Sequence, residues 1–376
     1  MTHLISMRTF ALAASIAIGA IAAPCQAVRL GVTNLVSDDP VGHPAQITDP
    51  GLKNAWGISA SPTGPFWVSS NGAGTAVLYR VDSVTQATTK VGLTVSIPGD
   101  GSVTGQVFNS SGAAAFNGDP FLFVNEDGTI SGWRGALGTT AEVLQLASDA
   151  VYKGSAFALT GGHSYLYAAN FHSGKVDVLK GDAGAPDLAG SFTDPALPSG
   201  YAPFNIQNLG GKLYVAYAKQ GAGKDEEAGA GKGFVSVFDL QGNFLGRVGS
   251  GGTLDAPWGM AIAPSSFGAF AGDLLVGNFG DGRINVFDQS TNSFLGQLLD
   301  ASASPLAIDG LWALAVGRAG ASGGSVDDVY FTAGPGEEAH GLFGVLTVAS
   351  AAAPEPGSAA LTLLGLTGLA ALRRRR

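Results

Sequence analysis

The stretch APWGMAIAPSSFGAFAGDLLVGNFGDGRINVFD, residues 256–288, contains three short apolar segments separated by turns rich in glycine, proline and aspartate. Each segment is too short for a typical helix and is bounded by residues that favour tight turns. The pattern predicts three consecutive antiparallel strands joined by short connections.

The central strand of this stretch has counterparts along the whole chain. The six related segments are PFWVSSN (65–71), PFLFVNE (120–126), SYLYAAN (164–170), GKLYVAY (211–217), GDLLVGN (272–278) and DDVYFTA (327–333). Their aligned central residues are 55, 44, 47, 61 and 55 positions apart. A repeat of about fifty residues is typical of a β-propeller, in which each repeat forms one blade.

Each repeat contains enough apolar segments for four strands. Small, apolar first strands are expected at WGISASP (56–62), WGMAIAP (258–264) and LWALAVG (311–317). Fourth strands are expected at VGLTVSI (91–97), EVLQLAS (142–148), LAGSFTD (188–194), FLGRVGS (244–250) and FLGQLLD (294–300). The last repeat lacks a fourth strand downstream, whereas RLGVTNLV (29–36) stands alone near the N-terminus.

We therefore expect an all-β fold, a six-bladed β-propeller over residues 28–349, in which 29–36 completes the last blade. Closing the ring in this way would remove an open strand edge. The alternatives are a β-sandwich or a β-solenoid, but a solenoid repeat would be shorter. The 57 glycines and the low charged fraction of 13% also favour a turn-rich β protein.

Residues 1–27 have the pattern of a secretory signal peptide. Arg8 is followed by an apolar stretch (9–23) and then by Pro24-Cys25-Gln26-Ala27. We expect cleavage after Ala27, which would remove the single cysteine of the chain and exclude a disulfide or thiolate metal site. The alternatives are a buried N-terminal helix and a lipoprotein signal at Cys25.

A second targeting pattern lies at the other end of the sequence. A linker at 350–356 ends in Pro354, Glu355 and Pro356, and residues 357–376 consist of an uncharged run followed by Arg373, Arg374, Arg375 and Arg376. The run predicts a short transmembrane helix, with the arginines on the cytoplasmic side. This order of features resembles the PEP-CTERM sorting signal of Gram-negative bacteria. The resemblance implies recognition by a membrane-embedded exosortase and cleavage near the Pro-Glu-Pro tripeptide.

The stretch 256–288 is also similar to an NHL-type propeller repeat. A longer ordered set of segments resembles an uncharacterised family of secreted bacterial propeller proteins, several of which carry the same C-terminal signal. The segments are WGISASPTGPFWVSSNG (56–72), NEDGTISGW (125–133), YAPFNIQNLGGKLYVAYAKQ (201–220), LLVGNFGDGRI (274–284), IDGLW (308–312) and FTAGPGEEAHGLFG (331–344). The resemblance implies the fold and an exported location, but no activity.

Candidate ligand residues follow the second strand of each repeat, on the face of a propeller where ligands usually bind. The aligned residues are Asn71, Glu126, Asn170, Tyr217, Asn278 and Ala333. Three amides and a carboxylate could supply oxygen ligands to Ca²⁺. Propellers that hydrolyse lactones use a similar Glu/Asn/Asp set to polarise a carbonyl. The alternative is that the asparagines only satisfy the backbone of tight turns.

Three further groups of residues bear on this face. The insertion GAGKDEEAGAGKG, residues 221–233 and called the flap below, is too polar to pack and is expected to be mobile. The alternative is a tolerated loop without a functional role. His172, Glu337, Glu338 and His340 are expected to be solvated loop residues. Trp56, Trp258 and Trp312 are expected to pack in the core.

The charge of the chain limits its partners. Its net charge is −9, but five of its 20 basic residues and none of its 29 acidic residues lie in residues 1–27 and 357–376. The remaining 15 basic and 29 acidic residues give −14 for the rest of the chain. Such a surface disfavours binding to nucleic acid.

Together these features predict export by the Sec machinery, a transient inner-membrane anchor and sorting by exosortase to the cell surface or extracellular matrix. There we expect a binding or structural module for a surface polysaccharide, a protein or a small molecule. The alternative is a secreted, metal-dependent enzyme of the lactonase or lyase type, with catalysis around Glu126.

Overall fold

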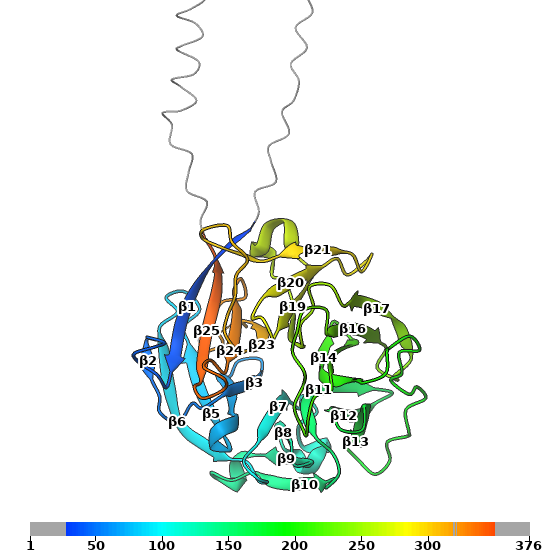
Figure 1. Ribbon diagram of the computed structural model, residues 1–376. Coiled ribbons are helices and arrows are strands. Elements are labelled where there is room, and N and C mark those ends of the chain that lie inside the picture. The colour runs from blue at the N-terminus through cyan, green and yellow to red at the C-terminus, as the bar shows by residue number, and fades with distance from the viewer. Residues whose placement is uncertain (1–27, 319, 321, 350–376) are drawn as a thin grey trace, which may run out of the picture.

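The computed structural model describes residues 28–318, 320 and 322–349. The predicted signal peptide, the Pro-Glu-Pro linker and the predicted sorting helix lie outside these residues. Six β-sheets are arranged as blades of a ring around a central axis (Figure 1). The predicted all-β, six-bladed propeller is therefore confirmed.

The first three blades follow one another along the chain, and the strands of each run from the axis outward. Blade one is β3 (Ala55–Ser59), β4 (Phe66–Ser70), β5 (Thr75–Val81) and β6 (Thr88–Ser96). Blade two is β7 (Val103–Phe108), β8 (Phe121–Asn125), β9 (Thr129–Trp133) and β10 (Glu142–Leu146). Blade three is β11 (Tyr152–Thr160), β12 (His163–Asn170) and β13 (Lys175–Lys180).

The other three blades are built in the same order. Blade four is β14 (Tyr201–Leu209), β15 (Lys212–Lys219), β16 (Gly233–Phe238) and β17 (Phe244–Ser250). Blade five is β18 (Pro257–Ile262), β19 (Leu274–Asn278), β20 (Ile284–Phe287) and β21 (Phe294–Gln297). Blade six is β23 (Leu311–Val316), β24 (Val329–Ala333), β25 (Leu342–Val348) and β1 (Arg29–Ser37).

Short elements occupy some of the connections. Two-residue strands β2 (Ile47–Thr48) and β22 (Leu299–Asp300) both pair in parallel with β1. The 3₁₀ turns are η1 (Asn71–Ala73), η2 (Gly112–Ala114), η3 (Phe116–Gly118), η4 (Gly135–Leu137) and η5 (Ser265–Phe270).

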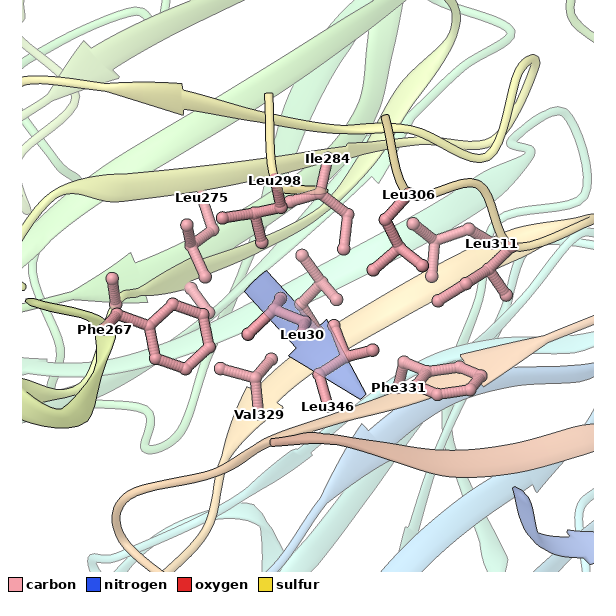
Figure 2. Packing of buried hydrophobic residues seen from close by; sticks show 14 of the residues in the cluster. Leu30, Phe267, Leu275, Ile284, Leu298, Leu306, Leu311, Val329, Phe331 and Leu346 are labelled. Carbon is pink, nitrogen blue, oxygen red and sulfur yellow. The ribbon is translucent and has the colours of Figure 1, made fainter. Parts of the chain in front are cut away.

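The ring closes through its N-terminal strand, as the sequence predicts. β1 pairs antiparallel with β25, from Leu30 opposite Val348 to Ser37 opposite Leu342, and the two strands lie side by side in Figure 1. Figure 2 shows the side chain of Leu30, 1% exposed, within a cluster that includes Leu346 of blade six and Leu275 of blade five. Burial of this strand therefore joins the beginning of the ring to its end.

Blade three differs from the prediction. The expected fourth strand at 188–194 is wrong, because this segment leaves blade three and joins the edge of blade four. The backbone N–H groups of Gly190 and Phe192 donate hydrogen bonds to Gln241 and Gly242, at 2.8 and 3.0 Å. Phe192 has a φ of 52°, outside the strand region, and its buried ring packs against Tyr167. A Cβ atom on Gly190 would lie 2.1 Å from the carbonyl carbon of Gly242, so this close approach requires glycine.

A bulge recurs near the start of every innermost strand. In each of the six, the register shifts after the first paired residues of the strand. The first residues in the six shifts are Trp56, Thr104, Lys153, Phe204, Trp258 and Trp312. Bulges redirect side chains and bend the strand. Glycines next to them let neighbouring inner strands touch: a Cβ atom on Gly259 would lie 2.4 Å from the carbonyl oxygen of Trp312. The strand starts therefore converge near the axis.

Candidate functional site

Aromatic side chains fill the centre of the ring where the inner strands begin. The ring of Trp312 stacks on Trp56 at a centroid distance of 3.8 Å and on Phe279 at 4.1 Å. Trp258 meets Trp312 edge-on at 5.9 Å. All three tryptophans are buried, so the prediction that they belong to the core is confirmed. Their packing makes an apolar floor beneath the connections of this face.

One of the six equivalent positions carries a cation instead of an aromatic ring. Lys153 stands on β11, and its side chain is 2% exposed. Its Nζ atom lies 5.3 Å from the ring centroid of Trp56, 5.9 Å from that of Phe171 and 6.0 Å from that of Phe204. Cation–π attraction offsets part of the cost of removing the ammonium from water.

Carboxylates from two other blades approach this ammonium. Glu126, in the turn between β8 and β9, has its Oε1 atom 2.5 Å from Nζ of Lys153. Asp225 and Glu226 of the flap each have a carboxylate oxygen 4.0 Å from the same Nζ atom. We call these four residues the Lys153 site.

Glu226 is the most perturbed carboxyl group of the site. Its side chain is 8% exposed, and burial raises its pKa from 4.5 to about 7, although Lys153 opposes this shift. Burial also raises the pKa of Glu338, whose carboxylate accepts a 2.5 Å hydrogen bond from Nδ2 of Asn54. The ionised carboxylates of Glu226 and Glu338 repel each other, which adds to the upward shift of the Glu226 pKa.

The flap is held in place, contrary to the expectation that it is too polar to pack. Glu227 forms 2.6 Å ion pairs with Lys219 and with Lys232, which flank the flap tip. The backbone N–H of Gly229 donates a 2.6 Å hydrogen bond to Asp255. These contacts direct Glu226 toward the axis. The charged residues of the flap therefore form the contacts that hold it in place, and its glycines allow the backbone to follow this course.

The three predicted asparagines are engaged in hydrogen bonds with other protein groups. Asn170 accepts a bond from the backbone N–H of Ser173 in its own turn, and Asn278 donates to the carbonyl of Thr253. Asn71 donates to the carbonyl of Val103 and accepts a 3.3 Å bond from Asn54. Of the four predicted ligands, only Glu126 contacts Lys153.

The Ca²⁺ site formed by Glu126 and the asparagines stays a prediction. No hydrogen bond in the described part of the chain joins Glu126 to the three asparagines, and Tyr217 and Ala333 are buried. Among the described residues, no three or more His, Cys, Asp or Glu side chains are arranged to hold a metal ion. The ammonium of Lys153 also repels a cation beside Glu126.

Sequence reasoning missed Lys153, Asp225 and Glu226 as members of the site, and it expected Glu338 to be solvated although burial raises the pKa of this residue. A signal for Lys153 exists in the alignment, because Lys153-Gly154 occupies the place of Trp56-Gly57 and Trp258-Gly259. Core packing gives no reason for a lysine at a position where related repeats carry tryptophan. No comparable sequence signal distinguishes Glu226 from Asp225 or Glu227.

A cavity lies next to the Lys153 site. Its volume is about 270 Å³, and its lining consists of Val151, Phe171, His172, Gln220, Gly221, Gly223 and Lys224. The cavity lies between the turn after β12 and the start of the flap. Phe171 belongs both to this cavity and to the aromatic surroundings of Lys153, so the two share a wall.

Residues 28–349, as far as they are described, include no helix long and apolar enough to span a membrane. The predicted transmembrane helix at 357–376 lies outside them.

Comparisons with known proteins show the family but no activity. No family model matches the chain. It is 32% identical over 320 residues to the uncharacterized protein R648 of Acanthamoeba polyphaga mimivirus, covering 79% of this chain and 75% of that protein. It is 32% identical over 321 residues to the uncharacterized protein L690 of the same virus, covering 79% and 81%.

Among solved structures, the apo-form of the soluble aldose sugar dehydrogenase from Escherichia coli has a TM-score of 0.51 and 12% identity, covering 84% of this chain and 99% of that one. At this identity the likeness shows the β-propeller fold alone. The sequence relatives are closer, and the chain belongs to the same family as the mimivirus proteins R648 and L690.

Proposed function

We propose that the protein is an exported β-propeller that binds its ligand at the Lys153 site. The observation that carries this proposal is a buried ammonium, with three carboxylates around it, at a position where three of the six equivalent residues are tryptophans. Buried charges cost free energy, and apolar residues of similar size would stabilise the fold at least as well. Such clusters are concentrated at functional sites.

The location of the protein forms the second part of the proposal. The sequence patterns at 1–27 and 354–376 support export, recognition by an exosortase and delivery to the cell surface or matrix. The test is to express the full chain in a Gram-negative host with and without an exosortase. We expect a shorter, protease-accessible product at the cell surface only when the enzyme is present. An unprocessed product that stays inside the cell would contradict this part.

Binding at the Lys153 site is tested by retention on the extracellular material of the producing culture. We expect the purified full-length protein to sediment with this material and the Lys153→Met variant to remain in solution. Lys175→Met at the exposed start of β13 is the matched control, since it removes an exposed lysine that forms no ion pair among the described residues. Equal retention of all three proteins would exclude the Lys153 site as the binding site.

An enzyme of the lactonase or lyase type is a second candidate, favoured by one observation. A carboxyl group with a pKa near 7, as for Glu226, can give or take a proton at neutral pH. A metal-dependent mechanism predicts a higher melting temperature in millimolar Ca²⁺ than in EDTA, because a ligand selective for the folded state stabilises it. Turnover of lactones that disappears in Glu126→Gln would support this candidate, and no turnover with no thermal shift would exclude it.

A further inference from the structure

We infer that the ligand of the Lys153 site is a neutral saccharide, with one hydroxyl group bridging Lys153 and Glu226. This inference rests on the proposed binding function and names its ligand class. It follows from unused hydrogen-bonding capacity, from the charge balance of the site and from the adjoining cavity.

The first argument is the distance between two groups that face each other without bonding. Nζ of Lys153 and Oε2 of Glu226 are 4.0 Å apart, beyond the roughly 2.7–3.2 Å of a hydrogen bond. Lysine has three donors, and in the described residues Nζ donates only to Glu126. The buried carboxylate of Glu226 accepts a hydrogen bond from its own backbone N–H and has no partner on another described residue. The ammonium and the carboxylate therefore both keep hydrogen-bonding capacity that no other described residue uses.

One hydroxyl group can bond to both the ammonium of Lys153 and the carboxylate of Glu226. An oxygen about 2.8 Å from each atom would see them at an angle of about 90°, which a hydroxyl can meet by accepting from the ammonium and donating to the carboxylate. A carboxylate ligand can only accept, and an ammonium ligand can only donate. Neither can bridge this pair alone.

The charge of the surroundings supports the same choice. Glu126, Asp225 and Glu226 surround the ammonium of Lys153, and the charge of Glu338 acts on the same group. Even with Lys224 on the wall of the cavity, carboxyl groups outnumber cations here. A negatively charged ligand would meet repulsion from these groups. A positively charged ligand would place a second cation beside Lys153. A neutral ligand with several hydroxyl groups avoids both penalties.

The aromatic surroundings and the cavity provide room for the rest of the ligand. The cavity of about 270 Å³ is close to the lower end of small-molecule sites, at roughly 300 Å³. It extends from Phe171 to polar groups on His172, Gln220 and Lys224. The indole N–H of Trp56 is buried without a partner in the described residues and adds one more free donor next to Lys153.

The experiment is calorimetric titration of the purified full-length protein with cellotetraose, mannotetraose and galactotetraose, and with tetragalacturonate as the acidic counterpart. We expect at least one neutral tetramer to bind and tetragalacturonate not to bind. In Glu226→Gln, which loses the charged acceptor, the affinity should fall at least tenfold. Glu337→Gln is the matched control, because Glu337 is an exposed glutamate next to Glu338 in the sequence, and its affinity should be unchanged.

Three results would overturn the inference: binding of no neutral tetramer, binding of tetragalacturonate alone, or equal affinities of the wild type and Glu226→Gln. A circular dichroism spectrum and melting curve of each variant exclude unfolding as the cause of lost binding. If no tetramer binds but Lys153→Met still abolishes retention on extracellular material, the ligand class is wrong and the proposed function stands. If Lys153→Met keeps that retention, the proposed function itself fails.

Discussion

Replacing Lys153 with methionine is expected to lower the free energy of unfolding by about 3–5 kcal/mol. Methionine fills a similar volume and packs well against Trp56, Phe171 and Phe204, so the cavity left behind is small. The loss comes from electrostatics, because the variant leaves the carboxylates of Glu126 and Glu226 in a buried site without their cation.

The expected change in melting temperature follows from the size of the folded part. Unfolding entropy is about 2.1 cal/mol/K per residue, so a propeller of roughly 320 residues shifts by about 1.5 °C for each kcal/mol. The variant should therefore melt about 5–7 °C below the wild type at pH 8. At pH 5 the difference should be smaller, because Glu226 and Glu338, whose pKa values are raised, are then more protonated.

Differential scanning calorimetry of four proteins isolates the interaction. They are the wild type, Lys153→Met, Glu126→Gln and the double variant. The double variant should lose less free energy of unfolding than the two single variants lose together, by about 1 kcal/mol or more. The reason is that the second change removes a charge that the first left unpaired. Lys175→Met, on an exposed lysine, should change stability by less than about 0.5 kcal/mol. A melting temperature within about 2 °C of the wild type, or a larger loss at pH 5 than at pH 8, would refute the reasoning.

Three further predictions concern the pH response, the axis and the ring closure. Glu226 has a folded-state pKa of about 7 against an ordinary value of 4.5, so its contribution to stability falls as pH rises through this window, by up to about 3 kcal/mol. Urea titrations should show that the free energy of unfolding of the wild type falls with rising pH relative to that of Glu226→Gln. A difference between the two proteins that does not change with pH would contradict this prediction. Gly259→Ala should cost about 1–3 kcal/mol, because its Cβ would meet the carbonyl of Trp312, whereas Gly92→Ala, with open space around its Cβ, should be nearly neutral in thermal melts. Deleting residues 29–37 should abolish cooperative melting, since β1 buries Leu30 and pairs with β25; an unchanged transition would show that closure does not need this strand.

The repeat made the architecture predictable, since each aligned strand must bury both faces between neighbouring blades. The same local pattern could not show where the segment 188–194 packs. Its apolar residues suit an outer strand of blade three, but Phe192 packs against both Tyr167 and Phe238, between blades three and four. The choice between these positions depends on contacts with residues far away in the sequence.

The central site was less predictable than the fold for a related reason. Glu126 could be singled out because it occupies an aligned turn position. Glu226 lies in the glycine-rich flap, whose composition favours a solvated loop. Its burial depends on the ion pairs of Glu227 and on the bond from Gly229 to Asp255, all of which form only when the ends of blade four are in place.

The sequence by itself determined the class of fold, the number of blades and the strand that closes the ring, because strand periodicity and repeat length are local and additive signals. Only the tertiary structure decided that the centre is filled by stacked tryptophans, that blade three has three strands and that Lys153 meets carboxylates from blade two and the flap. These features depend on distances across the axis. Such distances are set by the convergence of six bulged strands, which no single repeat encodes.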